Sequence, residues 1–256
     1  MQTTEKLTTL REKLRDTGMD GYVVTTGDFH GSEYVGSFFK TRAWLSGFTG
    51  SAGTLVVLPE RAALWTDGRY FLQAGQQLAG STIELMREGQ PGVPSVADFL
   101  AEHLPRGGTL GFDGRTVSAA FARGLEKALA PREIRFAADR DLVGEIWADR
   151  PALSAEPVWE LDAALAGLTR EEKLALLRRD MAAQDADTLL LTALDEIAWT
   201  LNLRGGDVAC TPVFLSFLLI GRARAVLCVQ RQILPLEIER ALAACVAREG
   251  EVRLDG

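Results

Sequence analysis

The 256-residue chain has two histidines, so few of its side chains are suited to proton transfer near neutral pH. His30 stands with Asp28, Ser32 and Glu33 in a polar segment, and a carboxylate beside an imidazole can orient the ring for acid–base chemistry or metal binding. The alternative, which we favour, is a hydrogen-bond network that orders a loop. His103 comes near the end of a predicted helix, where it would interact with the helix dipole.

Three glycines, Gly47, Gly50 and Gly53, lie close together in the segment SGFTGSAG. Glycine-rich loops can cradle phosphate, but the dinucleotide-binding spacing is not met and no P-loop lysine follows. The segment also leads into a predicted strand rather than a helix. We therefore interpret it as tight turning beside a sheet.

The segment WTDGRY has the features of a turn that leads into a helix. Asp67 is a natural N-cap residue, and Gly68 permits an unusual backbone angle. The guanidinium of Arg69 is well placed for an ion pair with Asp67 or another nearby carboxylate.

Two adjacent carboxylates, Asp195 and Glu196, precede the apolar part of a predicted helix, DEIAWTLNL. Such a pair could suggest acid–base catalysis. It is also what the positive N-terminal end of a helix favours, and we prefer that interpretation. Trp199 is predicted to pack in the core with Ala198 and Leu203.

The pattern of apolar residues predicts alternating helices and strands. A helix is expected over residues 5–17, a strand over 21–26, and a hairpin from two strands at 55–58 and 62–65. The rest of this half alternates between helices at 70–78, 95–104 and 118–129 and strands at 82–87, 109–113 and 133–137. These features predict an α/β fold with a mixed sheet and helices on its faces.

A proline-containing stretch, WADRPALSAEPVWELD, interrupts both periodicities. A new helix is predicted to begin near Thr169, where Glu172 completes a capping box. The sequence then repeats itself, because LREKLRDTGMDGYVVTT and LLRRDMAAQDADTLLLTA share a helix, a turn and a strand that leads into a Thr. The duplication aligns Thr25 with Thr192 and Trp44 with Trp199.

The second copy has fewer predicted elements than the first. Its paired apolar runs lie at 213–220 and 225–229, and a helix at 236–247 and a strand at 251–254 follow. A copy with fewer elements is expected to leave apolar surface uncovered.

Composition limits the possible partners. The chain is 47% hydrophobic and 25% charged, with a formal net charge of −7, and this acidic balance argues against nucleic acid and anionic membranes. No window reaches the roughly 20 apolar residues of a membrane span, and a cytoplasmic location is expected. Cys210, Cys228 and Cys245 are widely spaced and are predicted to be buried free thiols.

A long segment, DFHGSEYVGSFFKTRAWLSGFTGSAGTLVVLPERAALWTDGRYFLQAGQQL, resembles the N-terminal domain of the Xaa-Pro aminopeptidases, the aminopeptidase P or creatinase-type family, in their three-domain form. The second copy contains TALDEIAWTLNLRGGDVACTPVF, which resembles the family's second domain. The resemblance implies two related creatinase N-terminal-like domains, each a mixed β-sheet flanked by helices. We place the first at 1–148, a linker at 149–166, and an incomplete second domain at 167–256.

In that family a third, pita-bread-shaped domain carries a dinuclear metal site built from two Asp, one His and two Glu. Nothing in this sequence resembles that domain, so we expect no catalytic residue, no metal ligand and no cofactor in the chain. The parent enzyme is implied to use two divalent metal ions, with Mn favoured, and to release the first residue from peptides with proline second.

The resemblance implies that this chain shapes substrate access and subunit arrangement without its own catalysis. The partners implied are proline-containing peptides, bound through the catalytic domain, and further copies in a homo-oligomer. Arg69 is the implied substrate-binding residue, because the family places its turn near the opening of the catalytic domain. The alternative is a stand-alone, non-enzymatic peptide- or protein-binding module derived from the peptidase.

Overall fold

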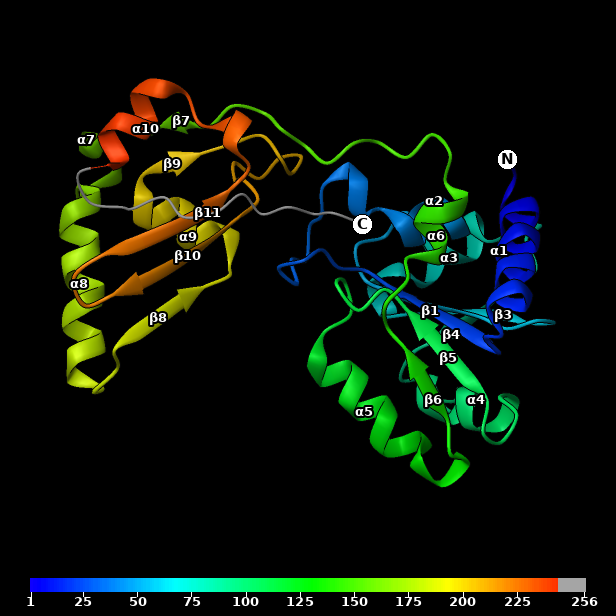
Figure 1. The fold of residues 1–256 in the computed structure, drawn as a ribbon. Helices are drawn as coiled ribbons and strands as arrows, with labels where there is room; N and C mark the ends of the chain where they lie inside the picture. Colours follow the sequence, from blue (N-terminus) through cyan, green and yellow to red (C-terminus); the bar gives the residue numbers. More distant parts are fainter. Residues whose placement is uncertain (244–256) are drawn as a thin grey trace. The chain divides into compact units, whose positions relative to one another are not determined.

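The computed structural model describes residues 1–243, which form two compact units (Figure 1). Unit 1 is Met1–Ala152 and unit 2 begins at Leu153. The predicted strand at 251–254, the end of the helix predicted to reach residue 247, and Cys245 lie outside the described residues.

Unit 1 is built on a six-stranded sheet with the strand order β4-β3-β2-β1-β5-β6. Its strands are β1 (Gly21–Thr25), β2 (Thr54–Val57), β3 (Ala62–Thr66), β4 (Ile83–Arg87), β5 (Thr109–Phe112) and β6 (Arg135–Ala137). β2 is antiparallel to both of its neighbours, whereas β1, β5 and β6 are mutually parallel and β3 is parallel to β4. Five strands therefore point in one direction, and the mixed sheet predicted from the sequence is confirmed.

Helices cover both faces of this sheet (Figure 1). One face carries α1 (Thr3–Thr17), α2 (Thr41–Ser46) and α6 (Leu142–Ile146), and the other carries α4 (Val96–His103) and α5 (Ala119–Leu129). The remaining helical segments are η1 (Ser37–Phe39), η2 (Gly68–Tyr70), α3 (Phe71–Gln77) and η3 (Ala130–Arg132).

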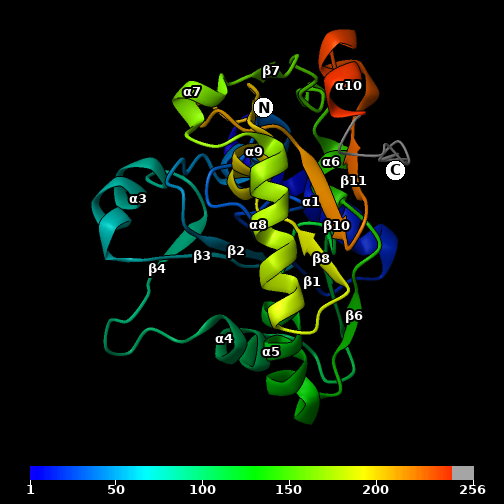
Figure 2. The ribbon, with the colours of Figure 1, turned by 90° about the vertical axis from the view of Figure 1, so that its left-hand side faces the viewer.

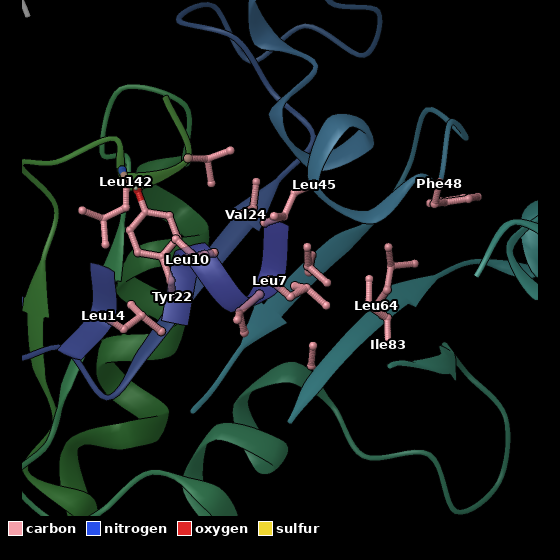
Figure 3. Packing of buried hydrophobic residues seen from close by; sticks show 14 of the residues in the cluster. Leu7, Leu10, Leu14, Tyr22, Val24, Leu45, Phe48, Leu64, Ile83 and Leu142 are labelled. Carbon is pink, nitrogen blue, oxygen red and sulfur yellow. Dashed lines mark hydrogen bonds between the residues drawn. The ribbon is translucent and has the colours of Figure 1, made fainter. Parts of the chain in front are cut away.

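The helical spacing of leucines in α1 explains why this helix packs on the sheet. Leu7, Leu10 and Leu14 recur every three or four residues and are at most 1% exposed. They meet Tyr22 and Val24 of β1 in the core shown in Figure 3. Full burial of each leucine contributes about 1.5–3 kcal/mol, and a Leu10→Ala change would cost about 2–5 kcal/mol.

Unit 2 contains a smaller sheet. Its strands β8 (Thr188–Leu191), β10 (Ser216–Gly221) and β11 (Ala225–Val229) are antiparallel, in the order β11-β10-β8. The long helix α8 (Arg170–Ala183) lies against this sheet (Figure 2), with α9 (Leu194–Leu201) beside it. The other elements are β7 (Trp159–Glu160), α7 (Ala163–Ala166), β9 (Leu203–Arg204), η4 (Arg231–Ile233) and α10 (Leu236–Leu242).

The start of α8 follows the sequence prediction. The Thr169 hydroxyl accepts from the Glu172 backbone N–H at 3.2 Å, and the Glu172 carboxylate accepts from the Thr169 N–H at 2.8 Å. This capping box satisfies two of the N–H groups that a helix leaves without an internal partner. α1 begins in a similar way, with the Glu5 carboxylate accepting from the Gln2 N–H at 2.8 Å.

Side-chain contacts repeat across the two units and support the duplication. The Lys6 ammonium donates to the Trp44 carbonyl at 2.7 Å, and the Lys173 ammonium donates to the Trp199 carbonyl at 2.8 Å. Each ammonium also lies over the same tryptophan's ring, at 4.4 and 4.3 Å from its centroid. Trp44 and Trp199 therefore occupy equivalent positions, as predicted.

A second contact repeats at the hairpins. Arg11 Nε donates to the Leu58 carbonyl at 3.0 Å, and Arg178 Nε donates to the Gly221 carbonyl at 3.0 Å. Strand register agrees, because Val24 of β1 pairs with Leu55 as Leu191 of β8 pairs with Leu218. The next residues, Thr25 and Thr192, are thus equivalent.

Two sequence predictions in unit 2 are wrong. Trp199 is 44% exposed, because the buried stripe of α9 consists of residues 194, 197, 198, 200 and 201, and residue 199 lies about 100° beyond residue 198 on the side away from this stripe. Cys210 is exposed rather than buried; it has a positive φ of 61° in the turn between Val208 and Thr211. Cys228 is half-buried.

Among the described residues, no helix is long and apolar enough to cross a membrane.

Candidate functional site

The carboxyl edge of the unit 1 sheet gathers most of the residues that the sequence singled out. Because five strands run in one direction, the segments that follow β1, β3 and β5 emerge at the same edge. The glycine-rich segment before the antiparallel β2 begins there too. Open α/β sheets bind ligands at the carboxyl ends of their strands. We therefore take this edge as the candidate site.

The turn after β3 is organised by Asp67. Its carboxylate accepts the backbone N–H of Arg69 at 3.0 Å, which confirms the predicted N-cap. It also accepts from Arg69 Nε and Nη2, both at 2.9 Å. This hydrogen-bonded ion pair lowers the pKa of Asp67 and raises the pKa of Arg69. The Arg69 side chain is nonetheless 62% exposed, so most of its guanidinium faces solvent.

Glu33 lies within electrostatic reach of this turn. Its carboxylate is the smallest of several contributions that raise the pKa of Arg69, after the Asp67 hydrogen bond and charge and the neighbouring Tyr70. The Tyr70 hydroxyl is hydrogen-bonded to Ser51 Oγ at 2.8 Å, which ties the turn to the glycine-rich loop. The segments after β1 and β3 and before β2 thus meet at one place.

Asp28 orders the loop after β1. One oxygen, Oδ1, accepts the backbone N–H groups of His30 and Ser32, both at 2.9 Å. The carboxylate is buried, with the residue 2% exposed, and its Oδ2 has no hydrogen-bond partner within the described part of the chain. Its hydrogen bonds to the His30 and Ser32 backbone are those of a loop-ordering residue.

Hydrogen bonds from Arg42 hold the glycine-rich loop in place. This buried guanidinium donates to the Phe48 carbonyl at 3.1 Å, to the Gly50 carbonyl, and to Thr26 Oγ1 at 2.9 Å. Burial lowers its pKa to about 10. Because the loop turns carbonyls toward a buried cation, its arrangement is explained without a phosphate. The sequence offered no signal for this role.

A second Asp-Gly-Arg turn follows β5 and was not singled out from the sequence. Arg115 donates from its backbone N–H and Nε to Asp113 Oδ1, both at 3.0 Å, which repeats the geometry at Asp67. Its guanidinium lies 5.5 Å from the Phe29 ring centroid and 3.7 Å from an Asp141 oxygen. The tripeptide Asp-Gly-Arg at 67–69 and 113–115 was the available signal.

The two histidines are separated by the sheet. His103 ends α4, which leads into the start of β5 and hence to the opposite edge. There its Nδ1 lies 2.8 Å from the Phe99 carbonyl and its Nε2 contacts Arg61.

In unit 2, Asp195 and Glu196 lie in the first turn of α9, as predicted. No group of three or more His, Cys, Asp or Glu side chains among residues 1–243 fits a metal centre, so we derive no step through a metal. The carboxyl edge offers cationic and anionic groups that can bind and orient a ligand.

Family comparison agrees with the duplicated framework. Residues 6–142 match the creatinase/prolidase N-terminal domain model, and residues 149–253 match a second model with the same description. The chain therefore belongs to the creatinase/prolidase N-terminal domain family.

Its similar proteins are peptidases. It is 40% identical over 240 residues to aminopeptidase P2 of Arabidopsis thaliana and 37% identical over 243 residues to the Xaa-Pro aminopeptidase ApepP of Drosophila melanogaster. Each alignment covers 92% of this chain, but 34% and 40% of the relative. The crystal structure of an X-prolyl aminopeptidase from Caenorhabditis elegans, described as a cytosolic enzyme with a di-nuclear active site, superimposes with a TM-score of 0.89 at 33% identity. That match covers 97% of this chain and 42% of that one. The chain thus spans between about a third and two fifths of these relatives.

Proposed function

We propose that this chain forms the N-terminal part of a metal-dependent Xaa-Pro aminopeptidase, which releases the first residue from peptides with proline second. Its role there is to shape substrate access and subunit arrangement, without catalysis of its own. The observation that carries the proposal is the tandem of two family matches, aligned over nearly the whole chain with proteins named as Xaa-Pro aminopeptidases. We propose in addition that the whole enzyme uses two divalent metal ions, with Mn favoured. It would be a homo-oligomer with a cytoplasmic location.

Within this role, Arg69 is the residue we assign to the substrate. Its guanidinium is exposed and is held by Asp67 in a fixed orientation. A planar guanidinium of this kind suits a peptide carboxylate or carbonyl. Asp28, His30 and Glu33 supply the neighbouring loop, with Asp28 as its organiser.

A comparison of the two units supports this assignment. Gln230 and Gln232 hold in unit 2 the places of Asp67 and Arg69, and the Gln232 amide donates to Gln230 Oε1 at 3.0 Å. The equivalent turn of unit 2 thus contains a hydrogen-bonded pair of uncharged side chains. The framework does not require charge there, so the charges of unit 1 are explained better by a ligand than by the fold.

Catalysis is tested directly on the purified chain. We expect no release of the first residue from a proline-second peptide when Mn²⁺, Co²⁺ or Zn²⁺ is supplied, because the described residues offer no metal-ligand cluster. Metal-dependent turnover that survives rigorous purification and is abolished by His30→Ala would overturn the non-catalytic role.

Substrate contact is tested with an Arg69→Gln variant, which copies unit 2. We expect the tripeptide Ala-Pro-Ala to shift the backbone NMR resonances of residues 66–70 in the wild-type chain, and these shifts to disappear in the variant. Arg106→Gln is the matched control, because Arg106 makes a similarly exposed bidentate pair with Glu133. Equal shifts in both variants would remove Arg69 from the proposal.

The alternative is a stand-alone, non-enzymatic module that binds peptides or proteins. It predicts tight peptide binding by residues 1–256 alone. The proposed role in a larger enzyme predicts weak binding that becomes productive only with a catalytic domain. The affinity measured in the Ala-Pro-Ala titration separates the two.

A further inference from the structure

Unit 1 contains a cavity of about 450 Å³ that has no part in the carboxyl-edge turns. Met1, Lys6, Trp44, Ile146, Ala148 and Asp149 line it. Its size falls within the range of small-molecule sites, about 300–1,000 Å³. The wall combines apolar surface with one ammonium and one carboxylate.

The repeated framework shows what Lys6 lacks. In unit 2 the equivalent Lys173 is 1% exposed, and its ammonium has two acceptors, the Trp199 carbonyl at 2.8 Å and Asn202 Oδ1 at 2.6 Å. In unit 1 the half-buried Lys6 ammonium has one hydrogen-bond acceptor among residues 1–243, the Trp44 carbonyl. An ammonium carries three donors.

The missing acceptor has a defined origin. Asn202 stands three residues after Trp199 with φ 52°, and Gly47 stands three residues after Trp44 with φ 78°. Both residues end their helices in the left-handed conformation, but glycine has no side chain. In unit 2 the Asn202 amide also donates to the Leu168 carbonyl, and the alignment that pairs Lys6 with Lys173 pairs Met1 with Leu168. The place of the Asn202 side chain thus corresponds to the space between Met1 and Lys6, which line the cavity.

The other wall supplies the remaining chemistry. Asp149 is exposed and lies close enough to counteract the lowering of the Lys6 pKa by burial. Trp44 is stacked on Trp147 with ring centroids 5.0 Å apart, and Ile146 is 9% exposed. A ligand in the cavity can therefore contact the Lys6 ammonium, the Asp149 carboxylate and an apolar surface formed by Trp44 and Ile146.

We propose that this cavity binds a free α-amino acid with an apolar side chain. Its carboxylate accepts from Lys6 at the position that Asn202 Oδ1 holds in unit 2. Its ammonium group faces Asp149, and its side chain lies against Trp44 and Ile146. This site is independent of the proposed peptidase role, and its test uses no peptidase activity.

The experiment titrates the chain with L-leucine and follows the indole N–H resonances of Trp44 and Trp147. Saturable shifts are expected. Isocaproate, which lacks the ammonium, and isoamylamine, which lacks the carboxylate, should each bind about 10- to 100-fold more weakly, since a charge-assisted hydrogen bond contributes about 1.5–3 kcal/mol. Equal binding of leucine and either analogue would overturn the amino-acid assignment.

A Gly47→Asn variant should fill the site with the side chain of unit 2. A Cβ at Gly47 would meet its nearest neighbour, Thr3 Oγ1, at 3.5 Å, an ordinary contact, and asparagine tolerates the left-handed conformation. We expect this variant to lose leucine binding, as Lys6→Met should. Gly18→Asn is the matched control, because Gly18 also ends a helix with positive φ but has open space around it. Leucine binding that persists in a folded Gly47→Asn variant, or its absence in the wild-type chain, would overturn the site.

Discussion

Lys6 and Lys173 hold the same place in the two units, yet one lines a cavity and the other is sealed in a core. The same contrast recurs elsewhere in the duplicated framework. Arg42 corresponds to Ile197, and both are buried, but only the arginine organises a loop. The two units thus share a backbone arrangement, and they differ in the polar side chains at equivalent positions.

The sheet faces differ as well. Val23 and Val56 of unit 1 are at most 1% exposed beneath α4 and α5. Their equivalents in unit 2, Leu190 and Leu219, are 56% and 39% exposed and directly paired across the strands. No described helix of unit 2 covers that face as fully. This face of the unit 2 sheet therefore presents two leucines to solvent.

The largest expected effect is at Arg42. An Arg42→Met variant removes the donors to the buried Phe48 and Gly50 carbonyls, and we expect a loss of about 3 kcal/mol in the free energy of unfolding. Ile197→Met in unit 2 is the control and should cost less than about 1.5 kcal/mol. Urea denaturation with hydrogen exchange resolved by unit measures both. Equal losses would show that Arg42 acts only as packing.

The two lysines give the next comparison. Lys173→Met leaves Asn202 Oδ1 without its lysine donor and removes one of two donors to the Trp199 carbonyl, which keeps the Asn202 backbone N–H at 3.3 Å. It should cost about 1–2 kcal/mol, whereas Lys6→Met should cost less because the Lys6 side chain is only half-buried. Burial lowers the pKa of Lys173 below its usual value. As pH approaches about 10.4, the unfolded chain therefore binds more protons than the folded chain. Its contribution to stability therefore rises with pH in that alkaline window.

The variant should lack this rise. The measurement is the difference in unfolding free energy between wild type and Lys173→Met from neutral to alkaline pH. A difference that does not change with pH would contradict the cause we assign.

The exposed face of unit 2 should affect association more than folding. A Leu190→Thr/Leu219→Thr double variant should change the unfolding free energy by about 0.5 kcal/mol or less, since both side chains are substantially exposed. It should bind less of the dye ANS and associate less in light scattering. Leu72→Thr, an exposed leucine of unit 1, is the control. Unchanged association would show that the face takes no part in it.

The smallest effect is expected at the Asp67 turn. Replacement of Asp67 and Arg69 by glutamine copies unit 2 and should leave the fold unchanged and lower the neutral-pH stability only slightly, because surface ion pairs contribute little. The pKa of Asp67 is lowered, so its contribution is present above about pH 3.9 and lost as pH falls through the folded value. Acid titration should show a slightly flatter profile in the variant. A large loss at neutral pH would mean that the charges serve the fold.

Local patterns predicted the elements well, because caps and periodicity act within a few residues. The leucines of α1 and the capping box at Thr169 needed no knowledge of distant contacts. The duplication was also readable, and aligning it five residues further back would have paired Glu5-Lys6-Leu7 with Glu172-Lys173-Leu174. That extension would have pointed to the repeated lysine contact.

The candidate site was less accessible to such reasoning. Arg42 binds backbone carbonyls, which carry no sequence signature, so its role emerges only once the loop is folded. Trp199 was wrongly predicted to be buried, because an aromatic residue in an apolar helix suggests burial. Its exposure depends on which face of the helix carries it. Arg69 and Glu33 are close because the segments after β1 and β3 leave the sheet at the same edge, which depends on strand order.

The pairing of β1 with β5 also sets an order of events during synthesis. Gly21 pairs with Leu110, although the neighbouring β2 is complete at Val57. At about 5–20 residues per second, a ribosome needs roughly 4 to 18 s to extend the chain from Gly21 to Leu110. The β2–β3 hairpin is complete once Thr66 is made, and from then until β5 is made the other edge of β1 stays open. The nascent chain is therefore exposed to edge-to-edge pairing with other strands, and chaperones have that time in which to protect it.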